Sequence, residues 1–113
     1  MTRLSITSVS SLIVCACLGI GLSAKQNSSK GDPAKGKETF EQCAVCHNVD
    51  TDEKKMGPSL KNLFKHKTMA GNKPVTEANV LAQINNGGNG MPAYGDMLSA
   101  DEKANLVAYL HTL

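Results

Sequence analysis

The first helix that the pattern of apolar and polar positions predicts begins at Pro33. Asp32 is suited to cap it, because a carboxylate accepts backbone N–H bonds and proline leaves no N–H unsatisfied at the first position. Gly36 and Phe40 are four residues apart and therefore share one helix face. We expect this helix to reach about Cys43, and we expect another helix to cross it closely at Gly36.

Two further helices are predicted in the second half of the chain. Thr76 can cap one that continues to Asn86, with an inward apolar pair at Val80 and Ile84 and a stop at Gly87-Gly88. The last opens with the capping box Ser99-Ala100-Asp101-Glu102, ends near His111, and is expected to cross the first helix at Gly36 through its stripe of Leu106, Tyr109 and Leu110.

The remaining segments predict little regular structure. Residues 60–64 are expected to form a short helix with Leu60, Leu63 and Phe64 facing inward. No stretch alternates between apolar and polar residues for long enough to predict a strand. The predicted fold class is therefore all-α.

The amino-terminal stretch has the composition of an export signal. Arg3 precedes an apolar run at residues 12–22, and Ser23-Ala24 supplies a small-residue cleavage site. The run is shorter than the roughly 20 residues that span a bilayer. We expect residues 1–24 to be a signal peptide, residues 25–31 a flexible lead-in, and residues 32–113 one domain in the periplasm. The alternatives are a retained membrane anchor and a lipid anchor at Cys17.

Removal of residues 1–24 would leave 89 of the 113 residues, with two Phe, two Tyr and no Trp. Such a chain has room for one small core, and chains of this size often need a covalent or metal staple. We expect a monomer that relies on a bound group for part of its core.

The charge balance excludes one class of partner and leaves another open. Twelve basic residues face ten acidic ones, so nucleic acid is not indicated. One segment nevertheless gathers lysines, either as a solvated surface or as a docking face for an acidic redox protein. Its members are Lys54, Lys55, Lys61, Lys65, Lys67 and Lys73.

The segment Cys43-Ala44-Val45-Cys46-His47 carries the chemistry. C-x-x-C-H is the pattern of c-type haem attachment: two thiols three residues apart form thioethers, and the adjacent histidine ligates the iron. A zinc site would need a second pair of ligands, and a thioredoxin-like site would need a βαβ unit. A disulfide between Cys43 and Cys46 is the remaining alternative, because two cysteines in an oxidising compartment usually pair.

Gly57-Pro58 follows the motif closely. The Pro58 carbonyl can accept the proton of the His47 nitrogen that does not bind metal, an interaction that orients the ring and raises its basicity. A plain turn explains the same dipeptide equally well.

A haem held by one histidine leaves the opposite axial position to be filled. Met91 stands apart among the candidates, because it lies in a loop between a glycine-rich turn and Pro92. Met97 is expected to pack at the haem edge, whereas His66 and His111 are expected at the surface, His111 on a frayed helix end. The other candidates are Met56 and Met69, both in polar stretches.

Together these motifs resemble class I monohaem cytochrome c of the bacterial periplasmic type. The matching pieces, in order, are Gly36 with Phe40, the C-x-x-C-H segment, Gly57-Pro58-Ser59-Leu60, Gly90-Met91-Pro92-Ala93-Tyr94 and the last helix. The resemblance implies four to five helices around one covalent haem c, with the first and last helices crossing. It implies haem attachment at Cys43 and Cys46, axial ligands His47 and Met91, and a role for the Pro58 carbonyl.

The function expected from this resemblance is one-electron transfer between redox proteins outside the cytoplasm, without catalysis. Two protein ligands would leave no iron position for a substrate. A peroxidase-like or gas-binding protein is the alternative if Met91 does not ligate the iron.

Overall fold

The computed structural model describes residues 30–113, and the predicted signal peptide and most of the lead-in lie outside them. Three α-helices dominate: α1 (Pro33–Phe40), α2 (Glu77–Asn86) and α3 (Ala100–Leu110). Two short 3₁₀ helices, η1 (Leu63–Lys65) and η2 (Ala70–Asn72), accompany them. The predicted helical fold is confirmed, with a small hairpin added from β1 (Thr68–Met69) and β2 (Lys73–Pro74). No helix of the described residues is long and apolar enough to cross a bilayer.

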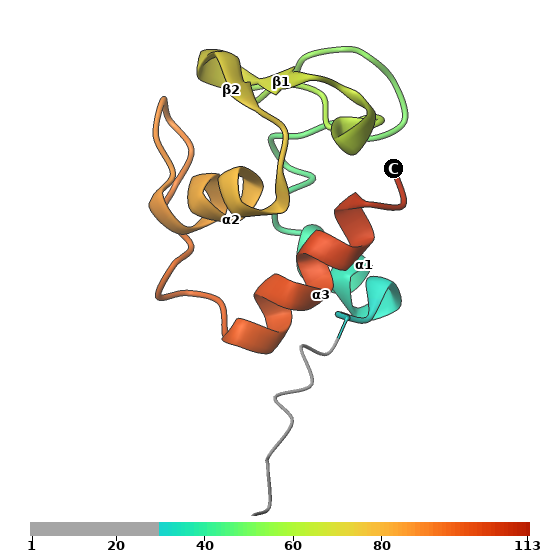
Figure 1. Ribbon diagram of the computed structural model, residues 1–113, viewed down its shortest axis with the longest axis vertical. Coiled ribbons are helices and arrows are strands. Elements are labelled where there is room, and N and C mark those ends of the chain that lie inside the picture. The colour runs from blue at the N-terminus through green and yellow to red at the C-terminus, as the bar shows by residue number, and fades with distance from the viewer. Residues whose placement is uncertain (1–29) are drawn as a thin grey trace, which may run out of the picture.

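The first and last helices cross closely, as Figure 1 shows for α1 and α3. Gly36 is buried at the crossing, and a Cβ there would collide with the carbonyl group of Asn105 and lie 2.8 Å from the Cβ of Tyr109. The rings of Phe40 and Tyr109 pack beside this point, with centroids 5.3 Å apart. The predicted crossing at Gly36 is therefore confirmed.

Replacing Gly36 with alanine should lower the free energy of unfolding by about 1–3 kcal/mol, the usual cost of overpacking. In an open helix the same change would stabilise by about 1 kcal/mol, so the sign of the effect tests the crossing. Urea denaturation of the haem-loaded protein measures it. Lys37→Ala, on the exposed face of α1, is the matched control and should change little. Stabilisation by Gly36→Ala would contradict the close approach.

The helix ends follow the capping residues of the sequence. The Thr76 hydroxyl accepts from the Asn79 amide at 3.1 Å, and α2 stops at Gly87, whose φ is 63°. At α3, both bonds of the capping box between Ser99 and Glu102 are present. The hydrogen bonds from Ser99 lower the pKa of the Glu102 carboxyl. Both predicted helices thus begin and end within a residue or two of the expected positions.

Three local expectations were wrong. Helix α1 ends at Phe40, before Cys43, because the chain tightens there into a bond from the Cys43 amide to the Phe40 carbonyl of 2.7 Å. The expected helix at residues 60–64 is only the 3₁₀ turn η1, because Asn62 has a left-handed φ of 55°. The hairpin of β1 and β2 was not expected, since strands of two residues leave no period-two pattern.

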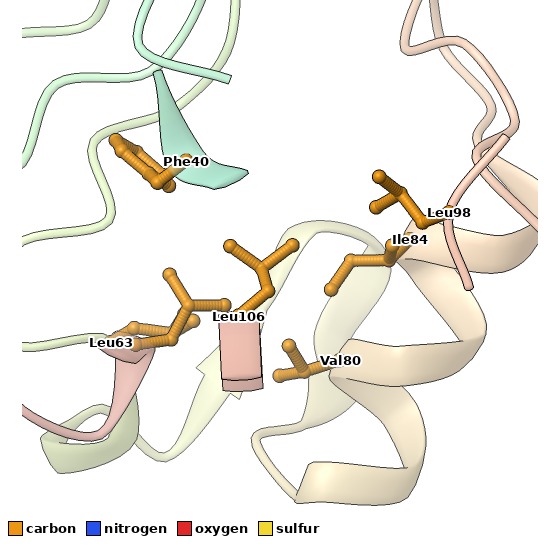
Figure 2. Packing of buried hydrophobic residues seen from close by; sticks show 7 residues of the cluster. Phe40, Leu63, Val80, Ile84, Leu98 and Leu106 are labelled. Carbon is orange, nitrogen blue, oxygen red and sulfur yellow. The ribbon is translucent and has the colours of Figure 1, made fainter. Parts of the chain in front are cut away.

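The core lies between α1, α2, α3 and η1. In Figure 2, Val80 and Ile84 of α2 point toward Leu106 of α3, and Leu98 lies beside Ile84. Cys43, Met91 and Tyr94 pack against this cluster from its edge. The seven buried apolar residues are Phe40, Leu63, Val80, Ile84, Leu98, Leu106 and Leu110.

Candidate functional site

The cysteine segment continues directly from α1 in helix-like turns. The amides of Cys46 and His47 donate to the Cys43 carbonyl at 3.0 and 2.9 Å. Both cysteines are half-buried and carry free thiols. The two sulfur-bearing residues and His47 therefore lie on one tightly turned stretch, as the motif requires.

The loop that follows His47 is hydrogen-bonded back to the cysteine segment. The Gly57 amide donates to the Cys46 carbonyl at 2.8 Å, and the Lys55 ammonium donates to the Ala44 carbonyl at 2.9 Å. One of the clustered lysines thus has a structural role, which the sequence did not indicate. These two hydrogen bonds also bring Gly57 and Pro58 beside the His47 ring.

The His47 ring is held in one orientation. Its Nδ1 lies 2.8 Å from the Pro58 carbonyl oxygen. A carbonyl can only accept, so Nδ1 carries the proton, and in the neutral ring Nε2 keeps its lone pair. The ring packs on Gly57, where an added Cβ would lie 2.5 Å from Cε1. His47 is thus prepared to donate the Nε2 lone pair to a metal.

Met91 approaches the core from the loop between α2 and α3. Its side chain is half-buried and packs against the apolar cluster. The Gln83 amide, on α2, donates to the Gly87 carbonyl at 2.9 Å and lies 3.9 Å from the Met91 sulfur. Sequence reasoning missed Gln83; its place in the helix turn before the glycine pair was the only signal available.

The rest of the methionine loop is anchored on both sides. The Tyr94 amide donates to the Ile84 carbonyl at 2.9 Å, which ties the loop to α2. The Lys103 ammonium of α3 donates to the Gly95 carbonyl at 2.7 Å and to the Asn85 side chain at 3.1 Å. Met91 is therefore presented by a fixed loop.

The competing methionines are placed differently. Met56 is 79% exposed and Met97 is 65% exposed, so neither reaches the core. The expected packing of Met97 at a haem edge stays a prediction. Met69, in β1, is half-buried against the core and is the one remaining rival of Met91.

The two isolated histidines lie away from the site. His66 is exposed, and its Nε2 lies 3.1 Å from the Lys61 carbonyl oxygen. His111 is exposed as expected but is not frayed. Its Nε2 lies 2.7 Å from a Glu77 carboxylate oxygen, and its ring stacks on Phe64 with centroids 3.6 Å apart.

Tyr94, in the loop that carries Met91, packs against the apolar cluster, as Cys43 does. Burial raises the pKa of the Tyr94 hydroxyl, and the charges of the Cys43 and Cys46 thiolates raise it further. Burial also raises the pKa of the Cys43 thiol, with a smaller contribution from Cys46.

The donor set fits a covalently held haem better than a metal ion alone. Cys43 and Met91 pack against the apolar cluster, and Cys46 and His47 lie in the same turn as Cys43. Within residues 30–113, no three His, Cys, Asp or Glu side chains gather as metal ligands. The spacing of the two free thiols instead fits thioether bonds to a haem.

Comparison with known proteins gives a consistent set of similarities. A family model described as cytochrome c oxidase, cbb3-type, subunit III matches residues 31–110. Cytochrome c6 from Diacronema lutheri is 38% identical over 81 residues, which cover 71% of this chain and 94% of that protein. The crystal structure of cytochrome c6 from the diatom Phaeodactylum tricornutum superimposes with a TM-score of 0.58 at 30% identity, covering 73% of this chain and 93% of that one.

Two further relatives are matched over part of their length. Cytochrome c-554 from Methylosinus trichosporium is 32% identical over 62 residues, 54% of this chain and 47% of that protein. Cytochrome c oxidase subunit 2 from Alkalihalophilus pseudofirmus is 35% identical over 86 residues, 70% of this chain but only 25% of that protein. The similarity to that subunit is therefore confined to one portion of it.

Proposed function

The chain is a class I monohaem c-type cytochrome of the family described as cytochrome c oxidase, cbb3-type, subunit III, and we propose that His47 and Met91 close both faces of its haem. It carries single electrons on haem c bound covalently through the C-x-x-C-H motif. The haem supplies the reversible Fe(II)/Fe(III) couple. The proposal concerns how this chain's own residues hold and tune that couple.

The observation that carries the proposal is the fixed ring of His47. With Nδ1 held by Pro58 at 2.8 Å and the ring packed on Gly57, Nε2 is the only ring nitrogen free to ligate. The Pro58 carbonyl polarises the N–H bond, which makes Nε2 a stronger donor. Cys43 and Cys46, three residues apart in the same turn, supply the thioether bonds that keep the haem against this ring.

Met91 supplies the opposite ligand in the proposal. Its thioether is a soft donor that favours Fe(II) and raises the reduction potential. Anchoring of the loop to Ile84 and Lys103 keeps the sulfur in place in both redox states. With His47 and Met91 as protein ligands, the iron would have no open position for a substrate, so we propose that the protein has no catalytic activity of its own.

Redox proteins are the partners of such a carrier. We propose that this protein is exported and that its charged side chains guide association with those partners. The apolar run at residues 12–22, which follows Arg3, supports export. The side chains of Lys54, Lys67 and Lys73 make no ion pair within the described residues and remain free to steer an acidic partner. Lys61 is instead paired with Asp52 at 3.4 Å. Val45, 72% exposed beside the thiols, offers an apolar contact point.

The visible spectrum of protein matured in a host that attaches haem tests the proposal. A low-spin spectrum with a weak sulfur-to-iron charge-transfer band, unchanged when carbon monoxide is added to the reduced form, is expected. A high-spin spectrum, or one that shifts with carbon monoxide, would contradict the closed site and favour a ligand-binding protein.

Replacing Gln83 with leucine should lower the reduction potential without opening the iron. The amide dipole near the Met91 sulfur withdraws electron density from the donor, and hydrogen bonds around a haem tune its potential. Potentiometric titration measures the change. Asn86→Leu, exposed at the end of the same helix, is the control. An unchanged potential in Gln83→Leu would show that the amide does not act on the sulfur.

A further inference from the structure

The chain contains two Asn-Gly dipeptides, Asn86-Gly87 and Asn89-Gly90, on either side of one glycine. Asparagine is among the thermolabile residues. Asparagine is most labile before glycine. Glycine has no side chain to hinder its backbone nitrogen when that nitrogen attacks the side-chain carbonyl carbon of the asparagine. That attack needs a backbone N–H that is not engaged elsewhere. The two dipeptides differ in this respect.

Asn89-Gly90 forms the tip of a tight turn. The turn is closed by the Gly88 amide bonded to the Met91 carbonyl at 2.9 Å and the Met91 amide bonded to the Gly88 carbonyl at 3.0 Å. Asn89 and Gly90 both have positive φ, 53° and 89°, which is the Asn-Gly turn preferred between paired strands. Both residues are exposed, and an added Cβ at Gly90 would meet open space. Within the described residues, neither the Asn89 side chain nor the Gly90 amide has a hydrogen-bond partner.

In Asn86-Gly87, by contrast, the glycine amide is engaged in a hydrogen bond. The Gly87 amide donates to the Gln83 carbonyl at 2.8 Å and thereby caps α2. The Gly87 backbone also packs against Met91 and Pro92, with an added Cβ only 2.7 Å from the Pro92 carbonyl oxygen. Attack by this nitrogen would require the end of α2 to open.

We propose that Asn89 is a site of spontaneous deamidation in the folded protein, and that Asn86 is protected. The Gly90 nitrogen forms a bond to the Asn89 side-chain carbonyl carbon, ammonia leaves, and a cyclic imide results. Water then opens the ring at either carbonyl and gives aspartate or isoaspartate. The reaction needs only water and releases only ammonia, so no oxidant or enzyme takes part.

The product changes the turn that carries Met91. Either form adds one negative charge two residues before the proposed ligand, in a segment of the sequence that has no charged residue between Gln83 and Met91. Isoaspartate also inserts an extra backbone carbon into the turn that the hydrogen bonds between Gly88 and Met91 close. The aged protein is therefore expected to separate into a second, more acidic form on ion exchange.

The test is incubation of the mature haem-loaded protein at mildly alkaline pH, followed by proteolysis and mass spectrometry of the peptide that holds both dipeptides. We expect Asn89 to convert at least about fivefold faster than Asn86, the factor equivalent to about 1 kcal/mol for one retained hydrogen bond. The same chain unfolded in denaturant should convert both sites at similar rates, because the protecting bond at Gly87 is then absent.

Two variants complete the test. Asn89→Gln should suppress the acidic form, since the longer side chain closes a ring less readily. Gly90→Ala should slow its appearance by hindering the attack. Conversion of Asn86 as fast as Asn89 in the folded protein, or an acidic form that persists in Asn89→Gln, would overturn the proposal. So would a folded protein in which Asn89 stays intact while the unfolded chain reacts.

Discussion

Replacing Met91 with alanine is expected to leave the haem covalently attached and to open its iron to carbon monoxide. We propose that attachment depends on Cys43 and Cys46, which lie in a different segment from Met91. Loss of the soft thioether should lower the reduction potential by on the order of 0.1 V or more, a fraction of the ~0.8 V range that axial ligands cover. The visible spectrum of the reduced protein, with and without carbon monoxide, and a potentiometric titration measure both effects.

The other methionines make this test specific. Met56→Ala and Met97→Ala should leave spectrum and potential unchanged, because both side chains are largely exposed. Met69→Ala is the sharper control, since Met69 also packs against the core. A protein that binds carbon monoxide after loss of Met69 but not after loss of Met91 would show that the ligand is wrongly assigned.

The parts of the fold that the sequence predicted well are those governed by neighbouring residues. Thr76, and Ser99 with Glu102, cap helices through bonds that span three residues, so each is visible as a short pattern. Gly36 is visible for a different reason: glycine inside a helix is unfavourable unless something approaches closely. Its contact with α3 explains why it is there.

The parts that were missed depend on contacts between distant segments. His111 meets Glu77 and Phe64, which lie 34 and 47 positions away in the chain, and no pattern links them. Gln83 looks like any polar residue of an amphipathic helix until the chain turns back and brings Met91 beside it. The hairpin of β1 and β2 was missed because each strand is only two residues long.

For the candidate site, the types of haem-binding side chain and their order could be predicted from the sequence. The structure added the hydrogen bonds that hold these side chains in place. Two hydrogen bonds, from His47 to Pro58 and from Lys55 to Ala44, each span 11 residues. Proline and glycine at positions 57–58 hinted at the first, whereas a lysine in a polar loop carried no sign of the second. The iron ligands themselves stay a prediction that the Met91 variant tests.

Replacing both Cys43 and Cys46 with alanine is expected to abolish covalent haem and to unfold much of the domain. Within residues 30–113 the protein part of the core has only seven buried apolar residues, and the main helix-to-helix contact joins α1 and α3. Helix α2 and the methionine loop have less protein to pack on, so they depend most on the haem. Since small domains are stable by only about 5–15 kcal/mol, loss of so large an apolar group should remove most of that margin.

Haem retained by the polypeptide after extraction with acidified acetone, together with helix content from circular dichroism, measures both parts of this result. Val45→Ala is the matched control, because Val45 lies between the two cysteines but is 72% exposed, and it should keep its haem and its helices. The single variants Cys43→Ala and Cys46→Ala should each retain one thioether and an intermediate stability. Haem that survives extraction in the double variant would refute attachment at these sulfurs. A double variant that loses its haem yet keeps its full helix content would show instead that the protein core is sufficient alone.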